Sequence, residues 1–245
     1  MKTENILSIQ QHSSVYLGEL DKTRFHKHAA VVLLVGLSGP ISIECVGGVR
    51  VDCRSAILDA GLNHALDTCG QRVASVFFAL DQQFTQWLKF AFLHNQPYAF
   101  EVIDPAVIRK SKERQIITRD WDSVFQCQPS TIYHHAFDPR ILDCVTKLNL
   151  PEHFADKQAD FAQRVYLSSS RLNHLFKQTT GVSFRHYRLW SQLLHFMRSL
   201  NRSKNMLDTE HSSGFYDSAH LSNSYQKMLG ISPSSLIRKL DRFEV

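Results

Sequence analysis

Residues 167–190 read LSSSRLNHLFKQTTGVSFRHYRLW, and this stretch decides the fold of the C-terminal part of the chain. Ser168 is a good N-cap, because its hydroxyl can accept a hydrogen bond from a main-chain N–H of the first helical turn. Gly181 is a typical residue to end a helix. The apolar residues between them recur at helical spacing and are Leu172, Leu175 and Phe176. The pattern predicts an amphipathic helix from Ser168 to about Thr180.

The opposite face of that predicted helix is small, polar and basic. Its residues are Ser169, Ser170, Arg171, Asn173, His174, Lys177 and Gln178. A shorter helix is expected just before it, over residues 156–164. A short helix, a tight connection and a second helix with such a face are typical of a helix-turn-helix unit, which places side chains in the major groove of DNA.

The same arrangement occurs again in residues 214–236, GFYDSAHLSNSYQKMLGISPSSL. We expect one helix-turn-helix unit over residues 159–180 and another over residues 206–229. The helix predicted between them, from Ser183 to about Leu200, would be about 27 Å long. Because successive major-groove segments on one face of B-DNA lie ~34 Å apart, two units held at that spacing could bind neighbouring segments.

These stretches resemble the DNA-binding domain of the AraC/XylS family of transcriptional regulators. The matching phrases of the first unit are Leu167-Ser168, Leu172, Leu175-Phe176-Lys177, Thr180-Gly181-Val182-Ser183-Phe184 and Tyr187. Those of the second unit are Gly214-Phe215, Asp217-Ser218-Ala219-His220-Leu221-Ser222 and Gly230-Ile231-Ser232-Pro233-Ser234. The resemblance implies a sequence-specific regulator without catalysis of its own, which binds double-stranded DNA near a promoter and contacts RNA polymerase. It also implies an N-terminal cupin-like domain that senses a small-molecule effector or mediates dimerisation.

The resemblance further implies which residues contact DNA. In the first unit they are Ser170, Asn173 and His174 in the groove, Ser169 and Arg171 beside them, and Lys177 toward a phosphate. In the second unit they are Ser218, Ala219, His220, Ser222 and Asn223. For any single one of these residues, the alternative is an ordinary solvated helix face.

Three departures from the family pattern, at four positions, all concern the second unit. Asn223 stands where an Arg is usual, Gln192 replaces an Arg in the linking helix, and Thr209 and Glu210 occupy positions where small residues are usual. Asn can bond the edge of adenine but carries no charge for a phosphate. A buried carboxylate without a partner is costly. We therefore hypothesise that the first unit dominates the affinity for DNA.

Charge is distributed unevenly along the 245 residues. The chain has 28 Lys+Arg and 23 Asp+Glu, a net charge of +5. Residues 1–137 hold 13 of each kind, whereas residues 138–245 hold 15 basic against 10 acidic residues. The excess positive charge therefore belongs to the C-terminal part, which is typical of a domain that binds a polyanion.

The N-terminal part has a different pattern, with short apolar runs separated by turns. The runs between Phe25 and Leu80 are AVVLLVGL, ISIECV, VRVDC, SAIL and VASVFFAL, and the surest turns are Gly39-Pro40 and Gly47-Gly48. Strands of this length and spacing predict a small antiparallel barrel or sandwich. The fold class is therefore α+β, with a cupin-like β-barrel over residues 1–82 and an all-α DNA-binding domain over residues 138–245.

A helical connector is expected between these domains, over residues 83–137. Helices are predicted over residues 83–94 and from Asp104 to about Thr118. The first of them carries a stripe of aromatic residues, Phe84, Trp87 and Phe92. The stripe either packs on the barrel or forms the interface of a homodimer.

Three histidines of the barrel resemble parts of a cupin site. Alternate residues of a strand face the same side, so His26 and His28 could meet His64. The carboxylate that accompanies such histidines in metal-binding cupins is missing, because the residues from Val31 to Val35 stand in its place. A bound metal, an effector pocket and purely structural histidines are the alternatives. We expect an effector pocket, with no metal and no cofactor.

The sequence argues against a membrane protein, a secreted protein and a disulfide-stabilised protein. No apolar run approaches the 18 or so residues that span a membrane, and the N-terminus lacks a signal peptide, so we expect a cytoplasmic protein. Five cysteines without a C-x-x-C pair argue against a disulfide framework. Two alternatives stay open: a cupin-type metal enzyme, and a protein-interaction adaptor with a degenerate helix-turn-helix domain.

Overall fold

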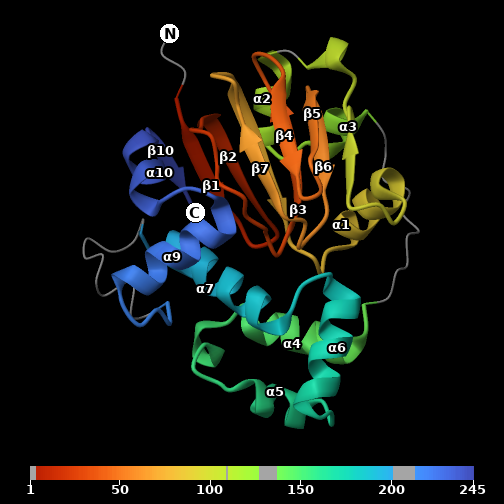
Figure 1. The fold of residues 1–245 in the computed structure, drawn as a ribbon, viewed down its shortest axis with the longest axis vertical. Helices are drawn as coiled ribbons and strands as arrows, with labels where there is room; N and C mark the ends of the chain where they lie inside the picture. Colours follow the sequence, from red (N-terminus) through yellow and green to blue (C-terminus); the bar gives the residue numbers. More distant parts are fainter. Residues whose placement is uncertain (1–3, 109, 127–136, 201–212) are drawn as a thin grey trace. The chain divides into compact units, whose positions relative to one another are not determined.

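The computed structural model describes residues 4–108, 110–126, 137–200 and 213–245 (Figure 1). It has the expected α+β class, with an N-terminal β-sheet domain and a C-terminal helical domain. Contacts divide the chain into two compact units, residues 1–133 together with 226–245, and residues 134–225. The dividing line falls inside helix α9 (Ser218–Leu229). No helix within the described ranges is long and apolar enough to cross a membrane.

The first unit contains two β-sheets. The larger has seven strands in the order β10-β1-β2-β8-β3-β6-β9, and the smaller has three in the order β5-β4-β7. The strands are β1 (Ile6–Ile9), β2 (Ser13–Glu19), β3 (Val31–Gly36), β4 (Ile41–Cys45), β5 (Val49–Cys53), β6 (Ser55–Leu58), β7 (His64–Asp67), β8 (Arg72–Phe78), β9 (Tyr98–Phe100) and β10 (Arg242–Glu244). The neighbours pair in antiparallel fashion, except β1 and β10, which are parallel.

The core of this unit is built on the strands that the sequence predicts. Every residue of β3 is buried, as expected for an uninterrupted apolar run that is covered on both faces. Leu33 of β3, Ile43 of β4 and Ile57 of β6 are completely buried. The predicted strands correspond to β3, β4, β5, β6 and β8, so the expectation of an antiparallel β domain is confirmed.

Strands β1 and β2 were not predicted, because polar residues occupy buried positions in both. Ser8 and Ser13 are buried, which hides the alternation of apolar and polar residues that identifies a strand. Both are satisfied by Arg119, whose Nε donates to Ser13 Oγ at 2.9 Å and whose Nη2 donates to Ser8 Oγ at 3.2 Å. Arg119, which is far from both serines along the chain, thus provides the hydrogen bonds that allow their hydroxyl groups to be buried in the sheet.

The connecting helices are shorter than predicted. Residues 83–94 form α1 (Gln83–Leu88) followed by a π-helix (Lys89–Leu93). The second predicted helix is wrong as a single element: it is a 3₁₀ turn (Pro105–Val107) and a separate helix α2 (Lys110–Ile117), because Ile108 leaves the helical region with ψ of 88°. Helix α3 (Trp121–Phe125) follows.

The aromatic stripe packs against these helices. Phe84 stacks on Trp87 with ring centroids 5.4 Å apart and on Trp121 at 6.0 Å. The rings of Phe92 and Phe125 lie 5.3 Å apart. The stripe therefore belongs to the packing of the first unit, and dimerisation through it stays a prediction. The proposed division at residues 82 and 137 also stays a prediction.

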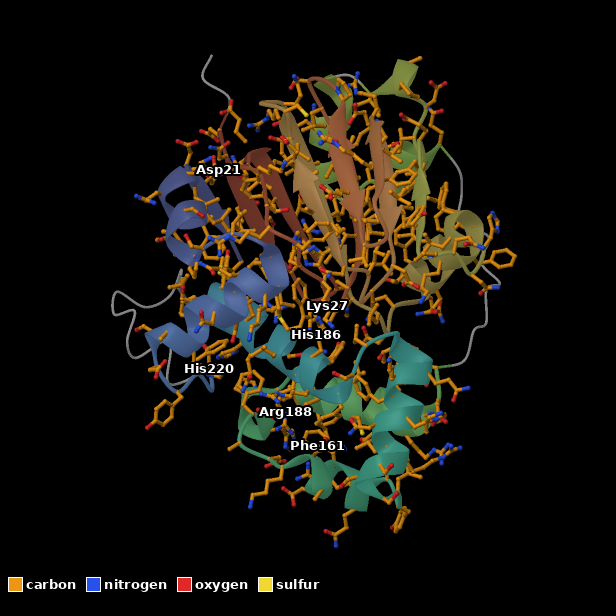
Figure 2. All side chains as sticks on the ribbon, viewed as in Figure 1. Asp21, Lys27, Phe161, His186, Arg188 and His220 are labelled. Atoms are coloured by element: carbon orange, nitrogen blue, oxygen red, sulfur yellow. The ribbon has the colours of Figure 1, made fainter. Side chains whose placement is uncertain are left out.

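The second unit is helical. It contains α4 (Pro139–Leu148), a 3₁₀ turn (Pro151–His153), α5 (Gln158–Arg164), α6 (Ser169–Thr180), α7 (Phe184–Leu200) and the first part of α9. Phe161, Phe176 and Phe184 meet edge to face, at centroid distances of 5.1 and 5.4 Å. Arg188 of α7 lies over the rings of Phe161 at 5.6 Å and Phe184 at 5.0 Å (Figure 2). Its cation–π contacts join α5 to α7.

Candidate nucleic-acid interface

Helix α6 begins and ends where the sequence predicts. Ser168 is its N-cap, and its Oγ accepts a hydrogen bond from the N–H of Arg171 at 3.2 Å. Gly181 ends the helix with φ of +80°, and its N–H donates to the carbonyl of Lys177 at 2.9 Å. Few side chains tolerate that left-handed conformation, so glycine fixes the length of the helix.

The two faces of α6 are sharply different. Leu172 and Phe176 are completely buried, and Leu175 is nearly so. All of the residues expected to contact DNA in the first unit are exposed, namely Ser169, Ser170, Arg171, Asn173, His174 and Lys177. With α5 before it, α6 completes a helix-turn-helix whose outer face carries these side chains. Their roles in binding stay predictions.

The charge on this face is not neutralised by neighbours. Within the described ranges, no carboxylate forms an ion pair with Arg171 or Lys177. By contrast, Arg164 at the end of α5 is paired with Asp156 at 2.8 Å. Two exposed cations that pair with no described carboxylate suit a surface that meets phosphates.

Helix α9 presents a similar face. Asp217 precedes the helix, and its Oδ1 accepts a hydrogen bond from the N–H of His220 at 2.6 Å. The predicted contact residues Ser218, Ala219, His220 and Asn223 are exposed, and Ser222 is half-buried. Leu221 and Tyr225 are buried beneath them.

The two recognition helices correspond residue by residue at a constant spacing along the chain. Leu172 corresponds to Leu221, Phe176 to Tyr225, and Gly181 to Gly230. In this register the exposed cations do not repeat: His220 takes the place of Arg171, and Gln226 takes the place of Lys177. Lys227, which is exposed, takes the place of Gln178, so the second face carries one exposed Lys or Arg where the first carries Arg171 and Lys177.

Gln192, one of the departures from the family pattern, has a structural role. Its side chain is buried in α7, and its Nε2 donates a hydrogen bond to the carbonyl of Gly214 at 3.4 Å. Gly214 has φ of +77° in the turn before α9. Gln192 thus helps to hold that turn. Asn223 is exposed in α9, and Thr209 and Glu210 lie outside the described residues.

Two exposed tyrosines were missed by the sequence reasoning. Tyr166 is 96% exposed in the turn before α6, and Tyr216 is 85% exposed in the turn before α9. Tyr166 has φ of +55°, which turns the chain sharply between α5 and α6. The sequence signal that could have identified them is a tyrosine shortly before each of the two predicted recognition helices.

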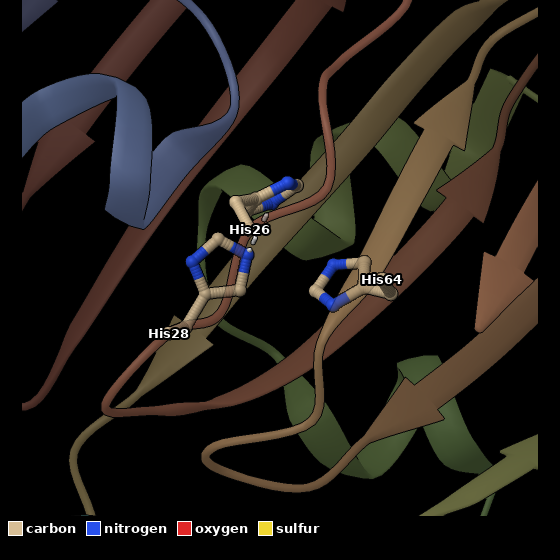
Figure 3. Close-up of side chains that lie close together, drawn as sticks. All are labelled: His26, His28 and His64. Atoms are coloured by element: carbon tan, nitrogen blue, oxygen red, sulfur yellow. Dashed lines mark hydrogen bonds between the residues drawn. The ribbon is translucent and has the colours of Figure 1, made fainter. Parts of the chain in front are cut away.

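The structure brings His26, His28 and His64 together inside the first unit (Figure 3). Their ring centroids are 4.4 to 5.2 Å apart, and the side chains are 4%, 5% and 2% exposed. The Nε2 atoms of His26 and His28 lie 3.1 Å apart. The three rings lie together as expected, but His26 and His28 precede β3 and are not part of a strand, and an effector pocket lined by the three histidines stays a prediction.

Burial favours the neutral form of His26 and His64. Desolvation, helped by the proximity of His64, lowers the pKa of His26 to about 3. Desolvation also lowers the pKa of His64. In a neutral imidazole one ring nitrogen is unprotonated and has an available lone pair. This neutral form is the one that binds metal ions.

The C-terminal helical region is similar in sequence to known DNA-binding regulators. Residues 161–239 match a family model described as a helix-turn-helix domain. Over 105 residues, the chain is 32% identical to the arabinose operon regulatory protein of Salmonella typhimurium and 31% identical to that of Escherichia coli K12. These alignments cover 41% of this chain but only 37% and 35% of the two relatives.

Solved structures resemble nearly the whole chain. A ligand-free variant of ToxT from Vibrio cholerae has a TM-score of 0.64 at 12% identity, and the match covers 95% of this chain and 99% of that one. Wild-type ToxT bound to an unsaturated fatty acid has a TM-score of 0.58 at 13% identity, with 98% of both chains covered. At this identity the likeness concerns the fold.

Proposed function

We propose that the chain is a transcriptional regulator of the AraC/XylS type that binds specific sequences of double-stranded DNA, because residues 161–239 match a helix-turn-helix family model and 105 residues are 32% identical to an arabinose operon regulatory protein. The observation that carries the proposal is the outer face of α6. There, polar and basic side chains are exposed above a fully buried apolar face, on a helix whose length is fixed by a cap at each end.

The side chains of α6 have the chemistry of base readout. Asn173 can form a bidentate pair with adenine, and Arg171 can do the same with guanine, each contributing about 1–3 kcal/mol of discrimination. Lys177 is one turn further along the exposed face and is suited to a phosphate. Helix α9 would bind a second groove segment with less positive charge.

The first unit would regulate this binding rather than catalyse a reaction. We propose that it responds to a small-molecule effector, since ToxT, which shares the fold, has been crystallised with an unsaturated fatty acid. The same unit would support a homodimer, and the DNA-bound protein would contact RNA polymerase in the cytoplasm.

Selection of binding sites from random duplex DNA tests the proposal directly. We expect the full chain to enrich a short discrete sequence, and Asn173→Ala to weaken binding to it by about tenfold or more. Asn173→Ala should also relax the base preference at one position. Thr146→Ala, which changes an exposed neutral residue of α4 in the same unit, is the matched control and should leave affinity unchanged.

Two results would refute DNA recognition by α6. One is enrichment of no sequence, with only weak and strongly salt-dependent binding, which is the behaviour of a non-specific or adaptor domain. The other is an equal loss of affinity in Asn173→Ala and Thr146→Ala. Circular dichroism of each variant excludes unfolding as the cause.

A further inference from the structure

The backbone of the first unit directs three imidazoles to one point. His26 and His64 lie directly opposite each other in an antiparallel bridge, in which each N–H donates to the other's carbonyl at 2.9 Å. Side chains of such a pair emerge on the same face. His28 is two residues beyond His26, and its ring joins the other two. The cluster is therefore positioned by an isolated β-bridge between the segment before β3 and the start of β7.

Hydrogen bonds to carbonyl groups fix two of the ring tautomers. His26 Nδ1 lies 2.8 Å from the carbonyl of Arg24, and His64 Nδ1 lies 3.1 Å from that of Leu62. A carbonyl oxygen can only accept, so both Nδ1 atoms carry the proton. The Nε2 atoms of both rings consequently hold lone pairs. Such second-shell bonds to Nδ1 are typical of histidines that bind metals.

We infer that His26, His28 and His64 form a binding site for one divalent transition-metal ion of the zinc type. In a tetrahedral site with Zn–N bonds near 2.05 Å, two ligand nitrogens are about 3.3 Å apart. The Nε2 atoms of His26 and His28 are already 3.1 Å apart, and one donor nitrogen from each ring lies within 4.8 Å of the others. Closing the remaining distance to the third donor would require the rings to rotate.

The donor set determines which ion fits and what else it takes. Three neutral imidazoles suit Zn²⁺, Co²⁺, Ni²⁺ or Cu²⁺ better than Mg²⁺ or Ca²⁺, which prefer oxygen. Three protein ligands leave a fourth position for water or an outside ligand. Because the imidazoles bring no negative charge, the ion keeps its double positive charge, so this position favours an anion such as a carboxylate. The absence of the carboxylate that accompanies such histidines in metal-binding cupins therefore does not prevent these three histidines from binding an ion.

Binding requires one internal proton shift. His26 Nε2 has a lone pair, so the proton between His26 and His28 belongs to His28 Nε2, which donates it. An ion at the centre takes the place of that proton, and His28 becomes protonated on Nδ1 instead. Both tautomers of His28 are neutral, so the shift leaves the charge of the ring unchanged.

Titration of the full chain with Co²⁺ and Zn²⁺, after dialysis against a chelator, tests the site. We expect one Co²⁺ per chain with the intense visible absorption of a tetrahedral complex, displaced by Zn²⁺, with a Kd of about 1 µM or tighter. His64→Gln should weaken binding by at least about tenfold. His12→Gln, which changes an exposed histidine of the same unit, is the matched control and should bind like the wild type.

A second variant keeps the test decisive if His64→Gln fails to fold. His28→Cys replaces one donor with another, so it should retain Co²⁺ and add a cobalt–thiolate charge-transfer band. Absence of stoichiometric binding to the folded wild type overturns the proposal. So does unchanged binding by folded His64→Gln, or Co²⁺ binding by His28→Cys without the thiolate band. None of these measurements depends on DNA, so the outcome is independent of the proposed regulatory function.

Discussion

The N–H of Arg24 donates a hydrogen bond to the carbonyl of Gly230 at 2.9 Å. Both residues belong to the first unit. Gly230 is the residue that follows α9, and the carbonyl of Arg24 accepts from the ring of His26 at 2.8 Å. The residue that ends the second recognition helix is thus two hydrogen bonds away from the histidine cluster.

Gly230→Ala should destabilise the first unit by more than about 1 kcal/mol. Gly230 has φ of +72°, and an added Cβ would lie 2.6 Å from both the carbonyl oxygen of Arg24 and Nδ1 of His26. Gly70→Ala is the control, because Gly70 has φ of +73° but open space around it. Urea unfolding measures both. If both variants lost the same unfolding free energy, the loss would come from backbone strain alone, and the close contact with Arg24 would contribute nothing.

Arg171→Ala should weaken binding to a selected DNA site by about tenfold or more, whereas Asn223→Ala should change it by less than about threefold. The reason is that α6 presents Arg171 and Lys177, while the corresponding residues of α9 are uncharged or histidine. Fluorescence anisotropy at one fixed salt concentration compares them. Arg140→Ala removes an exposed charge from α4 and controls for net charge. Similar losses from Arg171→Ala and Asn223→Ala would refute the dominance of the first unit.

Asp156 should contribute to stability at neutral pH and lose that contribution in acid. A hydrogen bond from His153, and then one from Arg164, hold the pKa of Asp156 below its usual 3.8. A carboxyl with a lowered pKa in the folded state stabilises above its unfolded pKa, and the stabilisation disappears as the pH falls through the folded pKa. Asp156→Asn should therefore show a shallower fall in unfolding free energy between about pH 5 and pH 3. Identical slopes in urea titrations would contradict this.

Zn²⁺ should stabilise the wild-type protein and not His64→Gln. An ion that binds only the folded state at 100 times its Kd adds about 2.7 kcal/mol to the unfolding free energy. Thermal melting with and without excess chelator measures the effect. Amide exchange at Arg24 should also slow with Zn²⁺, because its carbonyl accepts from a ligand ring. If Zn²⁺ stabilised His64→Gln as much as the wild type, the ion would bind at a site other than the three histidines.

Sequence patterns predicted the helical part well because its signals are local. The cap at Ser168, the stop at Gly181 and the apolar face between them lie within a single helix. They also predicted the buried strands, since β3 is one uninterrupted apolar run. Each of these elements is specified by residues that are close together in the chain.

What the sequence could not predict depends on partners that are far apart. Strand β1 is stabilised by Arg119 and by pairing with β10, and neither contact leaves a trace in its own residues. The bridge between His26 and His64 likewise joins residues that are far apart in the chain. The convergence of His26, His28 and His64, with one donor nitrogen of each ring within 4.8 Å of the others, is visible only in the folded unit.

The parallel pairing of β1 with β10 also bears on the order of events during synthesis. Ile6 is the register partner of Arg242, and the whole of the second unit is translated between them. While the ribosome is still producing α7, β1 has only one neighbouring strand, β2, and its other edge is open. The nascent protein thus exposes a sheet edge to chaperones or to other nascent chains until β10 emerges and covers it.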